Sequence, residues 1–245
     1  MDTAGYPSDD QQQPVMEEVW SMKNHSRDLE YLAILRSHTA TDHERSVMMA
    51  SKRKPLAILF IGNSHTYFND MPLMVQRRAE DAGYDCRVTM IAHGGWFLAQ
   101  HVEEPDVRFN ILYGHYDYVV LQEHAHPFGP EEKFREAAVR LNEMIRQAGS
   151  VPILYETWAR KAEPEAQAQM NEAHRRIAEE IGALLAPVGE NWWLYQKSWP
   201  DLEVYAEDSA HASPAGSDFA AKYIWEEIRG DIEHKKKIAG QTAQK

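Results

Sequence analysis

The pattern of hydrophobic and polar residues changes at Pro55. From this residue onward, short runs rich in apolar residues alternate with longer segments in which apolar residues recur every three or four positions. The first pattern is typical of strands in a parallel sheet and the second of amphipathic helices. This alternation predicts an α/β fold, a doubly wound parallel sheet of about five strands. Predicted strands span residues 56–61, 87–91, 116–122, 151–156 and 184–188, and predicted helices span 71–82, 131–148, 165–182 and 213–229.

The first 53 residues lack this alternation. Residues 1–16 are rich in Asp, Gln, Pro and Ser, which is typical of a disordered or loosely attached tail. Residues 17–38 contain a brief helical stripe formed by Leu29, Leu32 and Leu35. The stripe needs cover from its own domain or from a neighbouring subunit, so assembly of a homo-oligomer through this helix is one hypothesis. The predicted organisation is a tail and helical appendage at 1–53, an α/β domain at 54–232 and a polar C-terminal tail at 233–245.

The composition fits a globular protein and narrows its partners. The chain has 43% hydrophobic and 26% charged residues, with a formal net charge of -12. An acidic chain is a poor partner for nucleic acid or an anionic membrane, because both require a basic surface. The single cysteine, Cys86, excludes an internal disulfide framework. No apolar stretch is long enough to span a membrane and the N-terminus has no signal-peptide pattern, so a cytoplasmic location is expected.

A serine follows the first predicted strand at its carboxyl end. Gly62 ends the apolar run and Ser64 comes two residues later. Open α/β sheets bind ligands at the carboxyl edge of their central strands. Asn69 and Asp70 are candidate caps of the next helix, and Pro72 fits its first turn. This order of strand, glycine turn, serine and helix can present a hydroxyl nucleophile among backbone N–H groups. The alternative is a βα loop without a catalytic role.

A candidate base and carboxylate lie directly before the last predicted helix. A serine hydroxyl is a poor nucleophile at neutral pH, so it needs a base within hydrogen-bond reach and a partner that fixes the tautomer of that base. Among the 12 histidines, His211 is informative because Asp208 lies three residues before it. In a turn, this spacing lets the carboxylate contact the imidazole of its own segment. A polar helix-capping loop is the alternative interpretation.

The order of these residues along the chain resembles that of the SGNH/GDSL hydrolase superfamily. The matching blocks are Gly62-Asn63-Ser64 after the first strand, Gly94-Gly95 after the second, Leu121-Gln122-Glu123 at the end of the third and Asp208-x-x-His211 before the last helix. The resemblance covers roughly residues 55–230 and implies a three-layer α/β/α fold of flavodoxin type. It also implies ester hydrolysis without metal or cofactor, with Ser64 as nucleophile, His211 as general base and Asp208 as its orienting carboxylate. No dinucleotide-binding or Walker motif suggests a nucleotide.

The same resemblance implies an oxyanion hole. The backbone N–H groups of Ser64 and of either Gly94 or Gly95 would contribute to it. The third block departs from the glycine and asparagine that are usual in the family, so we assign the remaining donor to the side-chain amide of Gln122. The first block departs as well, and Asn63 is expected to form hydrogen bonds within its own turn.

Residues next to these blocks are assigned to the substrate-binding surface: His65, Trp96, Glu123, His124 and Trp158. Trp96 and Trp158 follow the second and fourth strands, where an aromatic ring could stack on a sugar or an acyl group, and ordinary packing is the alternative. His124 and His126 form a His-x-His pair after the third strand, which binds metal in some hydrolases. No paired carboxylate motif accompanies the pair, so no metal site is predicted.

The sequence therefore predicts a serine carboxylester hydrolase acting on small-molecule esters. Small acyl groups, acetyl above all, are expected, and a carbohydrate is a candidate carrier of the ester. One alternative is a catalytically silent domain of the same fold that binds a glycan or a protein through its aromatic rim. A second alternative is a metal-dependent hydrolase that uses His124 and His126.

Overall fold

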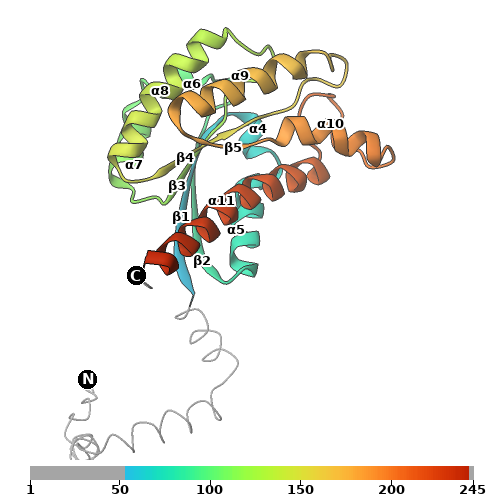
Figure 1. Ribbon diagram of the computed structural model, residues 1–245. Helices are drawn as coiled ribbons and strands as arrows, with labels where there is room; N and C mark the ends of the chain where they lie inside the picture. Colours follow the sequence, from blue (N-terminus) through green and yellow to red (C-terminus); the bar gives the residue numbers. More distant parts are fainter. Residues whose placement is uncertain (1–52, 243–245) are drawn as a thin grey trace, which may run out of the picture. The chain divides into compact units, whose positions relative to one another are not determined.

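The computed structural model describes residues 53–242. The predicted N-terminal tail and helical appendage therefore lie outside the described residues, apart from Arg53. The described residues belong to one compact unit in which helices cover a five-stranded sheet (Figure 1). The strands are β1 (Lys54–Gly62), β2 (Tyr84–Ala92), β3 (Tyr118–Leu121), β4 (Val151–Tyr155) and β5 (Leu184–Ala186). The helices are α4 (Ser64–Tyr67), α5 (Met71–Asp81), α6 (Leu98–His101), α7 (Pro105–Tyr113), α8 (Glu131–Gln147), α9 (Ala166–Ile181), α10 (Val188–Ser198) and α11 (Pro214–Thr242), with the 3-10 turn η1 (Phe68–Asp70).

The sheet has the strand order β2-β1-β3-β4-β5, and every neighbouring pair is parallel. Gly62 at the end of β1 pairs with Ala92 of β2, and Ile61 pairs with Leu121 of β3. The connection after β1 leads to one side of that strand, whereas β3 lies on its other side. Ligands bind in open α/β sheets at such a switch point. The predicted doubly wound sheet is confirmed, and its switch point lies where Ser64 follows β1.

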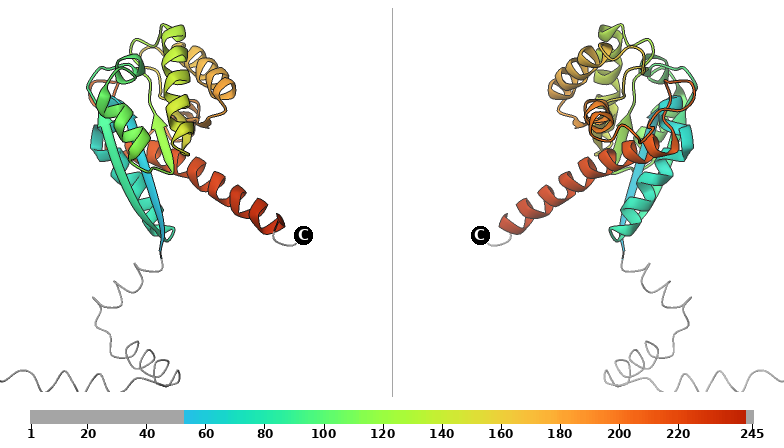
Figure 2. Two further views of the ribbon diagram at one scale, coloured as in Figure 1. Left: turned by 90° about the vertical axis from the view of Figure 1, so that its left-hand side faces the viewer. Right: turned by 90° about the vertical axis from the view of Figure 1, so that its right-hand side faces the viewer.

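The sheet separates two hydrophobic cores, as the three-layer prediction requires. Side chains alternate along β1, so Ile58 and Phe60 enter one core while Leu59 and Ile61 enter the other. The first core also contains residues of α5, α10 and α11, and the second contains residues of α6, α7, α8 and α9. Figures 1 and 2 show α5 and α11 on one face of the sheet and α7, α8 and α9 on the opposite face.

The last helix is longer than its sequence pattern predicts. The pattern places its end near residue 229, but α11 has 29 residues and continues to Thr242. No proline interrupts it, and Asp231 and Lys235 form an ion pair across one turn at 2.7 Å. Residues 233–242 are exposed and mostly polar, with Ile238 as an exposed apolar residue, so this stretch of the predicted C-terminal tail is a solvated helical extension. Within residues 53–242, no helix combines the length and apolar character needed to cross a membrane.

The prediction that Asn69 or Asp70 caps α5 through its side chain is wrong. Asp70 occupies the N-cap position in a left-handed conformation, but its side chain makes no capping hydrogen bond. The amide of Asn69 instead donates to the carbonyl of Ala212 at 3.0 Å and to Ser217 Oγ at 2.9 Å. This side chain therefore joins the segment after Ser64 to the segment around His211, a long-range role that local sequence could not reveal.

Candidate active site

The turn that carries Ser64 is fixed directly at the end of β1. The side chain of Asn63, the N-cap of α4, accepts a hydrogen bond from the His65 N–H at 3.0 Å, so the expected bonding within the turn is present. A Cβ atom on Gly62 would lie 2.4 Å from Thr66 Oγ1, so a larger residue does not fit there. Ser64 is partly exposed between buried neighbours. The turn therefore presents its hydroxyl at the switch point of the sheet.

Ser64, His211 and Asp208 form one hydrogen-bonded chain. Ser64 Oγ lies 2.8 Å from His211 Nε2, and His211 Nδ1 lies 2.5 Å from Asp208 Oδ2. Ser64 and His211 are 147 positions apart in the sequence, so only the folded sheet brings them together. This is the order of hydroxyl, imidazole and carboxylate that activates a serine.

Asp208 is held in its orientation by the turn that it begins. Its Oδ1 accepts hydrogen bonds from the N–H groups of Ala210 at 3.0 Å and His211 at 2.9 Å. Burial acts to raise the pKa of Asp208, but the hydrogen bonds from the His211 ring and these two N–H groups outweigh it and hold the pKa well below its usual range. The ionised carboxylate favours the tautomer in which Nδ1 carries the proton and Nε2 accepts from Ser64.

Phe68 and Trp158 position His211, and the sequence assigned neither of them this role. The Phe68 ring stacks on the imidazole with centroids 4.1 Å apart and an interplanar angle of 10°. Trp158 is fully buried, stacks on Trp192 at 3.8 Å and donates from Nε1 to the carbonyl of Ala210 at 2.8 Å. The assignment of Trp158 to the substrate-binding surface is therefore wrong, because the side chain supports the His211 segment from the core. For Phe68, the sequence signal that could have indicated a place beside the site was its position four residues after Ser64.

Three backbone N–H groups near Ser64 have no acceptor within residues 53–242. They belong to Ser64, Gly94 and Gly95, the groups that the sequence assigns to the oxyanion hole. The loop that contains the two glycines is joined to the Ser64 turn, because Asn63 Nδ2 donates to the Trp96 carbonyl at 2.9 Å. Both predicted sources of oxyanion donors therefore lie in one connected piece of structure.

Gln122 does not supply an oxyanion donor in this structure. Its side-chain oxygen accepts from the Asn63 N–H at 2.8 Å and from Thr66 Oγ1 at 2.9 Å. Its Nε2 donates to the backbone carbonyl of Glu123, and the residue is 1% exposed. The structure contradicts the prediction that this amide completes the oxyanion hole, because Nε2 is directed to the Glu123 carbonyl and the side chain lies buried beneath the turn.

Glu123 is buried rather than presented on an open surface. Its carboxyl group accepts from the N–H groups of His124 at 2.7 Å and Leu98 at 3.2 Å. Burial raises the pKa of Glu123 to about 7, and the two backbone hydrogen bonds only partly oppose this effect. The residue lines a cavity of about 260 Å³ together with Phe97 and Phe134, so its predicted contact with substrate is restricted to this cavity.

The predicted histidines differ in their surroundings. His65 is 8% exposed, and its ring centroid lies 4.9 Å from those of His126 and His211. Burial, followed by the charge of His126, lowers the pKa of His65 well below its usual value, so His65 is a neutral neighbour of His211. His124 is partly exposed and stacks on Phe97 at 4.2 Å. Trp96 is half-buried and packs on His93 at 4.2 Å.

The geometry around the His-x-His pair offers little to a metal ion. His126 Nε2 faces the carbonyl of Trp158 at 2.9 Å, and His124 Nδ1 faces the carbonyl of Pro127 at 3.0 Å. Burial lowers the pKa of His126 to about 4. Across the described part of the chain, no group of three or more His, Cys, Asp or Glu side chains is arranged to hold a metal ion.

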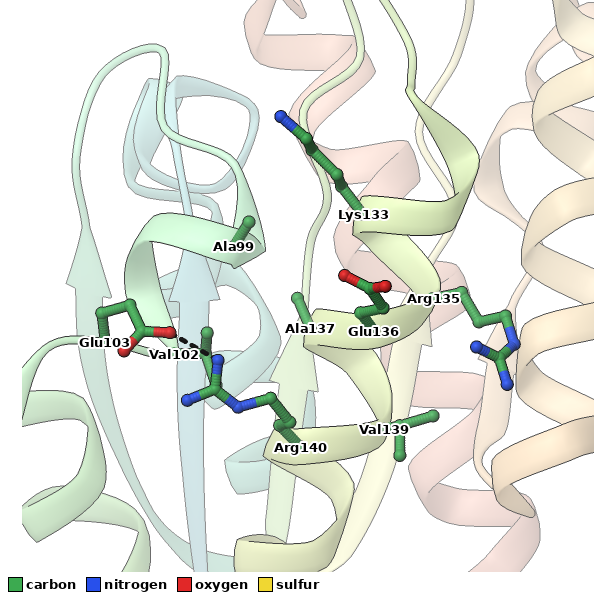
Figure 3. Close-up of a pocket in the computed structure, with 9 residues that line it drawn as sticks. All are labelled: Ala99, Val102, Glu103, Lys133, Arg135, Glu136, Ala137, Val139 and Arg140. Carbon is green, nitrogen blue, oxygen red and sulfur yellow. Dashed lines mark hydrogen bonds and ion pairs between the residues drawn. The ribbon is translucent and has the colours of Figure 1, made fainter.

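A more open cavity of about 530 Å³ lies between the α6 region and α8, apart from the Ser64–His211–Asp208 chain (Figure 3). Figure 3 shows an ion pair between Glu103 and Arg140 that crosses this space. Charged ends surround it and no triad residue lines it. Size alone therefore does not identify the active site here, whereas the hydrogen-bonded chain at the switch point does.

Comparisons with known proteins agree with this fold. No family model and no curated protein matches the sequence. Among solved structures, a candidate SGNH hydrolase from Slackia heliotrinireducens matches with a TM-score of 0.62 and 29% identity, over 71% of this chain and 100% of that chain. A carbohydrate esterase family 3 protein from Talaromyces cellulolyticus matches with a TM-score of 0.60 and 11% identity, over 73% and 99% of the two chains. The esterase EstA from Pseudoalteromonas matches with a TM-score of 0.56 and 14% identity, over 72% and 98%. The chain therefore has the fold of the SGNH/GDSL hydrolase superfamily, which confirms the resemblance found in its sequence.

Proposed function

We propose that the protein is a serine-dependent carboxylester hydrolase. The observation that carries this proposal is the chain from Ser64 Oγ through His211 to Asp208, located at the switch point of the sheet. A hydroxyl in contact with an oriented imidazole can act as a nucleophile, whereas an isolated serine cannot. The esterases among the structural neighbours support the same class of reaction.

The proposed reaction begins when Ser64 Oγ attacks the ester carbonyl and His211 Nε2 takes the hydroxyl proton. The negative charge that develops on the carbonyl oxygen is stabilised by the N–H groups of Ser64 and of Gly94 or Gly95. His211 then returns the proton to the departing alcohol, which leaves an acyl group on Ser64. A water molecule, deprotonated by His211, releases the acid and restores the serine. Loss of one oxyanion donor typically lowers turnover by about 100- to 1,000-fold.

The proposed substrates are esters of small acyl groups, acetyl in particular, carried on a carbohydrate. A half-buried Trp96 next to the glycine loop supports a sugar or acyl contact at this edge. The structural neighbours named as a carbohydrate esterase and an acetyl esterase support the same substrate class. Hydrolysis of acetylated sugars compared with longer-chain esters is the assay that examines this part of the proposal.

The first experiment is labelling with a fluorophosphonate probe followed by intact-mass and peptide analysis. We expect a single adduct on Ser64, because among residues 53–242 this is the serine that contacts an imidazole itself oriented by a carboxylate. Ser64→Ala should abolish the adduct and ester hydrolysis. Ser198→Ala is the matched control, because the Ser198 hydroxyl bonds only to a carbonyl of its own helix. A folded protein that gives no adduct and hydrolyses no ester would contradict the proposal.

One observation favours a second candidate function. The amide of Gln122 is engaged beneath the turn, so one of the predicted oxyanion donors is missing. A catalytically silent domain that binds a glycan or a protein at the same edge would tolerate this loss. That function predicts saturable binding of acetylated sugars with no turnover and no adduct on Ser64.

A further inference from the structure

Gln122 and Glu123 are adjacent, both are buried, and both direct their side chains to backbone N–H groups. Gln122 is 1% and Glu123 is 2% exposed. They follow the last residue of β3, and Gln122 remains joined to the sheet through its N–H bond to the Ile61 carbonyl at 2.9 Å. Two consecutive buried polar side chains require partners, because a buried polar group that forms no hydrogen bond destabilises the folded state. Their partners include groups of the Ser64 turn and of the loop that contains Gly94 and Gly95, besides neighbours in their own segment.

Gln122 fixes the Ser64 turn from below. Its side-chain oxygen accepts from the Asn63 N–H at 2.8 Å and from Thr66 Oγ1 at 2.9 Å. These two donors lie on either side of Ser64, and both residues are 1% exposed. The oxygen therefore holds the backbone that carries the hydroxyl and the Ser64 N–H.

Glu123 fixes the loop that contains Gly94 and Gly95. One carboxyl oxygen accepts from the N–H of Leu98, the first residue of α6, at 3.2 Å, and the other accepts from the His124 N–H at 2.7 Å. The same loop is held at its centre by the bond from Asn63 Nδ2 to the Trp96 carbonyl at 2.9 Å. The loop is thus attached at two points, one to the Ser64 turn and one to the end of β3.

We propose that Gln122 and Glu123 are a pair of positioning residues. Gln122 fixes the Ser64 turn and Glu123 fixes the Gly94–Gly95 loop, so that the backbone N–H groups of the turn and of the loop form the oxyanion hole. The pair takes the place of a side chain that donates directly to the oxyanion. Fixed donors stabilise a developing charge because they need no reorganisation during the reaction. The inference rests on the proposed function, since it explains how an ester hydrolase works without the Gln122 amide.

The raised pKa of Glu123, which results from burial, agrees with this arrangement. A carboxyl group that is partly neutral near pH 7 places less negative charge beside a developing oxyanion than a fully ionised one would. Its two oxygens still accept from the N–H groups of His124 and Leu98.

The decisive variant is Gln122→Asn, because the two possible roles of the amide predict opposite results. Asparagine is one methylene shorter, so it cannot reach both Asn63 and Thr66. The positioning role predicts that kcat falls by about 10- to 100-fold with little change in KM, since the donors move by a fraction of an ångström to about one ångström. A direct donor role predicts that the variant, which carries the residue type usual in the family, keeps or increases kcat, and this result would overturn the proposal.

Thr66→Val and Thr157→Val provide a matched pair. Both threonines are buried after a strand, but Thr66 Oγ1 donates to Gln122 whereas Thr157 Oγ1 has no partner among residues 53–242. We expect Thr66→Val to lower kcat and Thr157→Val to leave it unchanged. Thr66→Val combined with Gln122→Asn should lose less than the product of the two single effects, because both act on one contact. Equal effects of the two threonine variants, or independent effects in the double variant, would contradict the proposal.

Glu123→Gln tests the second half of the pair. Glutamine keeps the size of the side chain but offers one oxygen for two N–H donors, so kcat should fall by about tenfold while the folded structure is retained, as circular dichroism would report. Unchanged kcat would exclude a positioning role for Glu123. Measurements on the wild-type protein separate this outcome from a failure of the proposed function. If the wild type forms no adduct on Ser64 and hydrolyses no ester, the enzyme assignment fails. If the wild type is active and the variants are fully active, only the positioning pair is overturned.

Discussion

At the scale of single residues, the site depends on the contacts that hold His211 and on the neutral His65 beside it. Three contacts fix the position of the His211 imidazole. Asp208 lies at Nδ1, Ser64 lies at Nε2 and the Phe68 ring stacks on one face. His65, which lies 4.9 Å away, stays neutral because it is buried, so it adds no charge that would oppose an imidazolium at His211.

Replacement of Asp208 by asparagine should reveal this dependence. The asparagine amide would donate to His211 Nδ1 and so place the ring proton on Nε2, where it can no longer accept from Ser64. We expect kcat to fall by about 1,000- to 10,000-fold, with no comparable change in the unfolding temperature. Glu207→Gln, a change at the exposed neighbouring carboxylate, is the control and should retain activity. Loss of less than tenfold in D208N would mean that Asp208 does not orient His211.

At the scale of elements, the site is assembled by connections between the ends of strands and the last loop. The segment before α11 carries Asp208 and His211, and it is attached to the core through Trp158 and to the turn after α4 through Asn69. A backbone bridge between Tyr205 and Ala212 closes the segment on itself. These contacts hold the imidazole of His211 against Ser64 although the segment is not part of the sheet.

Trp158→Phe should weaken this attachment without removing the stacked ring. The carbonyl of Ala210 would lose its buried donor, so we expect the free energy of unfolding to fall by about 1–2 kcal/mol and kcat to fall as well. Trp192→Phe is a matched control, because Trp192 is the ring that stacks on Trp158 and its own Nε1 has no partner among residues 53–242. Equal losses of kcat in the two variants would attribute the effect to packing alone and contradict the attachment through Ala210.

At the scale of the whole molecule, stability depends on pH through carboxyl groups that are buried when the chain folds. Glu156 is 0% exposed and lies after β4, where its Oε1 accepts from the Glu190 N–H in the first turn of α10 at 2.7 Å. Burial raises the pKa of Glu156 from 4.5 to about 7, more than the backbone hydrogen bond lowers it. The folded state therefore binds a proton more tightly than the unfolded state, and the contribution of Glu156 to stability falls as pH rises from about 4.5 to about 7.

Glu156→Gln should remove this part of the pH dependence. Glutamine stays neutral, so the difference in unfolding free energy between the variant and the wild type should shift in favour of the variant by about 3 kcal/mol between pH 4.5 and about pH 8. Urea unfolding of both proteins across this range gives the measurement. Glu163→Gln, at an exposed glutamate, is the control for the substitution itself. Parallel stability curves for Glu156→Gln and the wild type would contradict the prediction.

The same scale includes the regions outside the described residues. The five strands and the two hydrophobic cores described above lie within residues 53–242. Assembly through residues 17–38 remains a prediction from the leucine stripe.

The sequence by itself determined the sheet, the edge at which chemistry takes place and the identity of the three residues that form the hydrogen-bonded chain. These features depend on local patterns: apolar runs define the strands, Gly62 permits the turn, and the spacing of Asp208 and His211 lets them meet within one segment. The tertiary structure alone decided what Gln122, Glu123 and Trp158 do. A polar or aromatic side chain at the end of a strand can face a substrate or the interior with equal local preference, and the burial and partners that decide between them come from segments distant in the sequence.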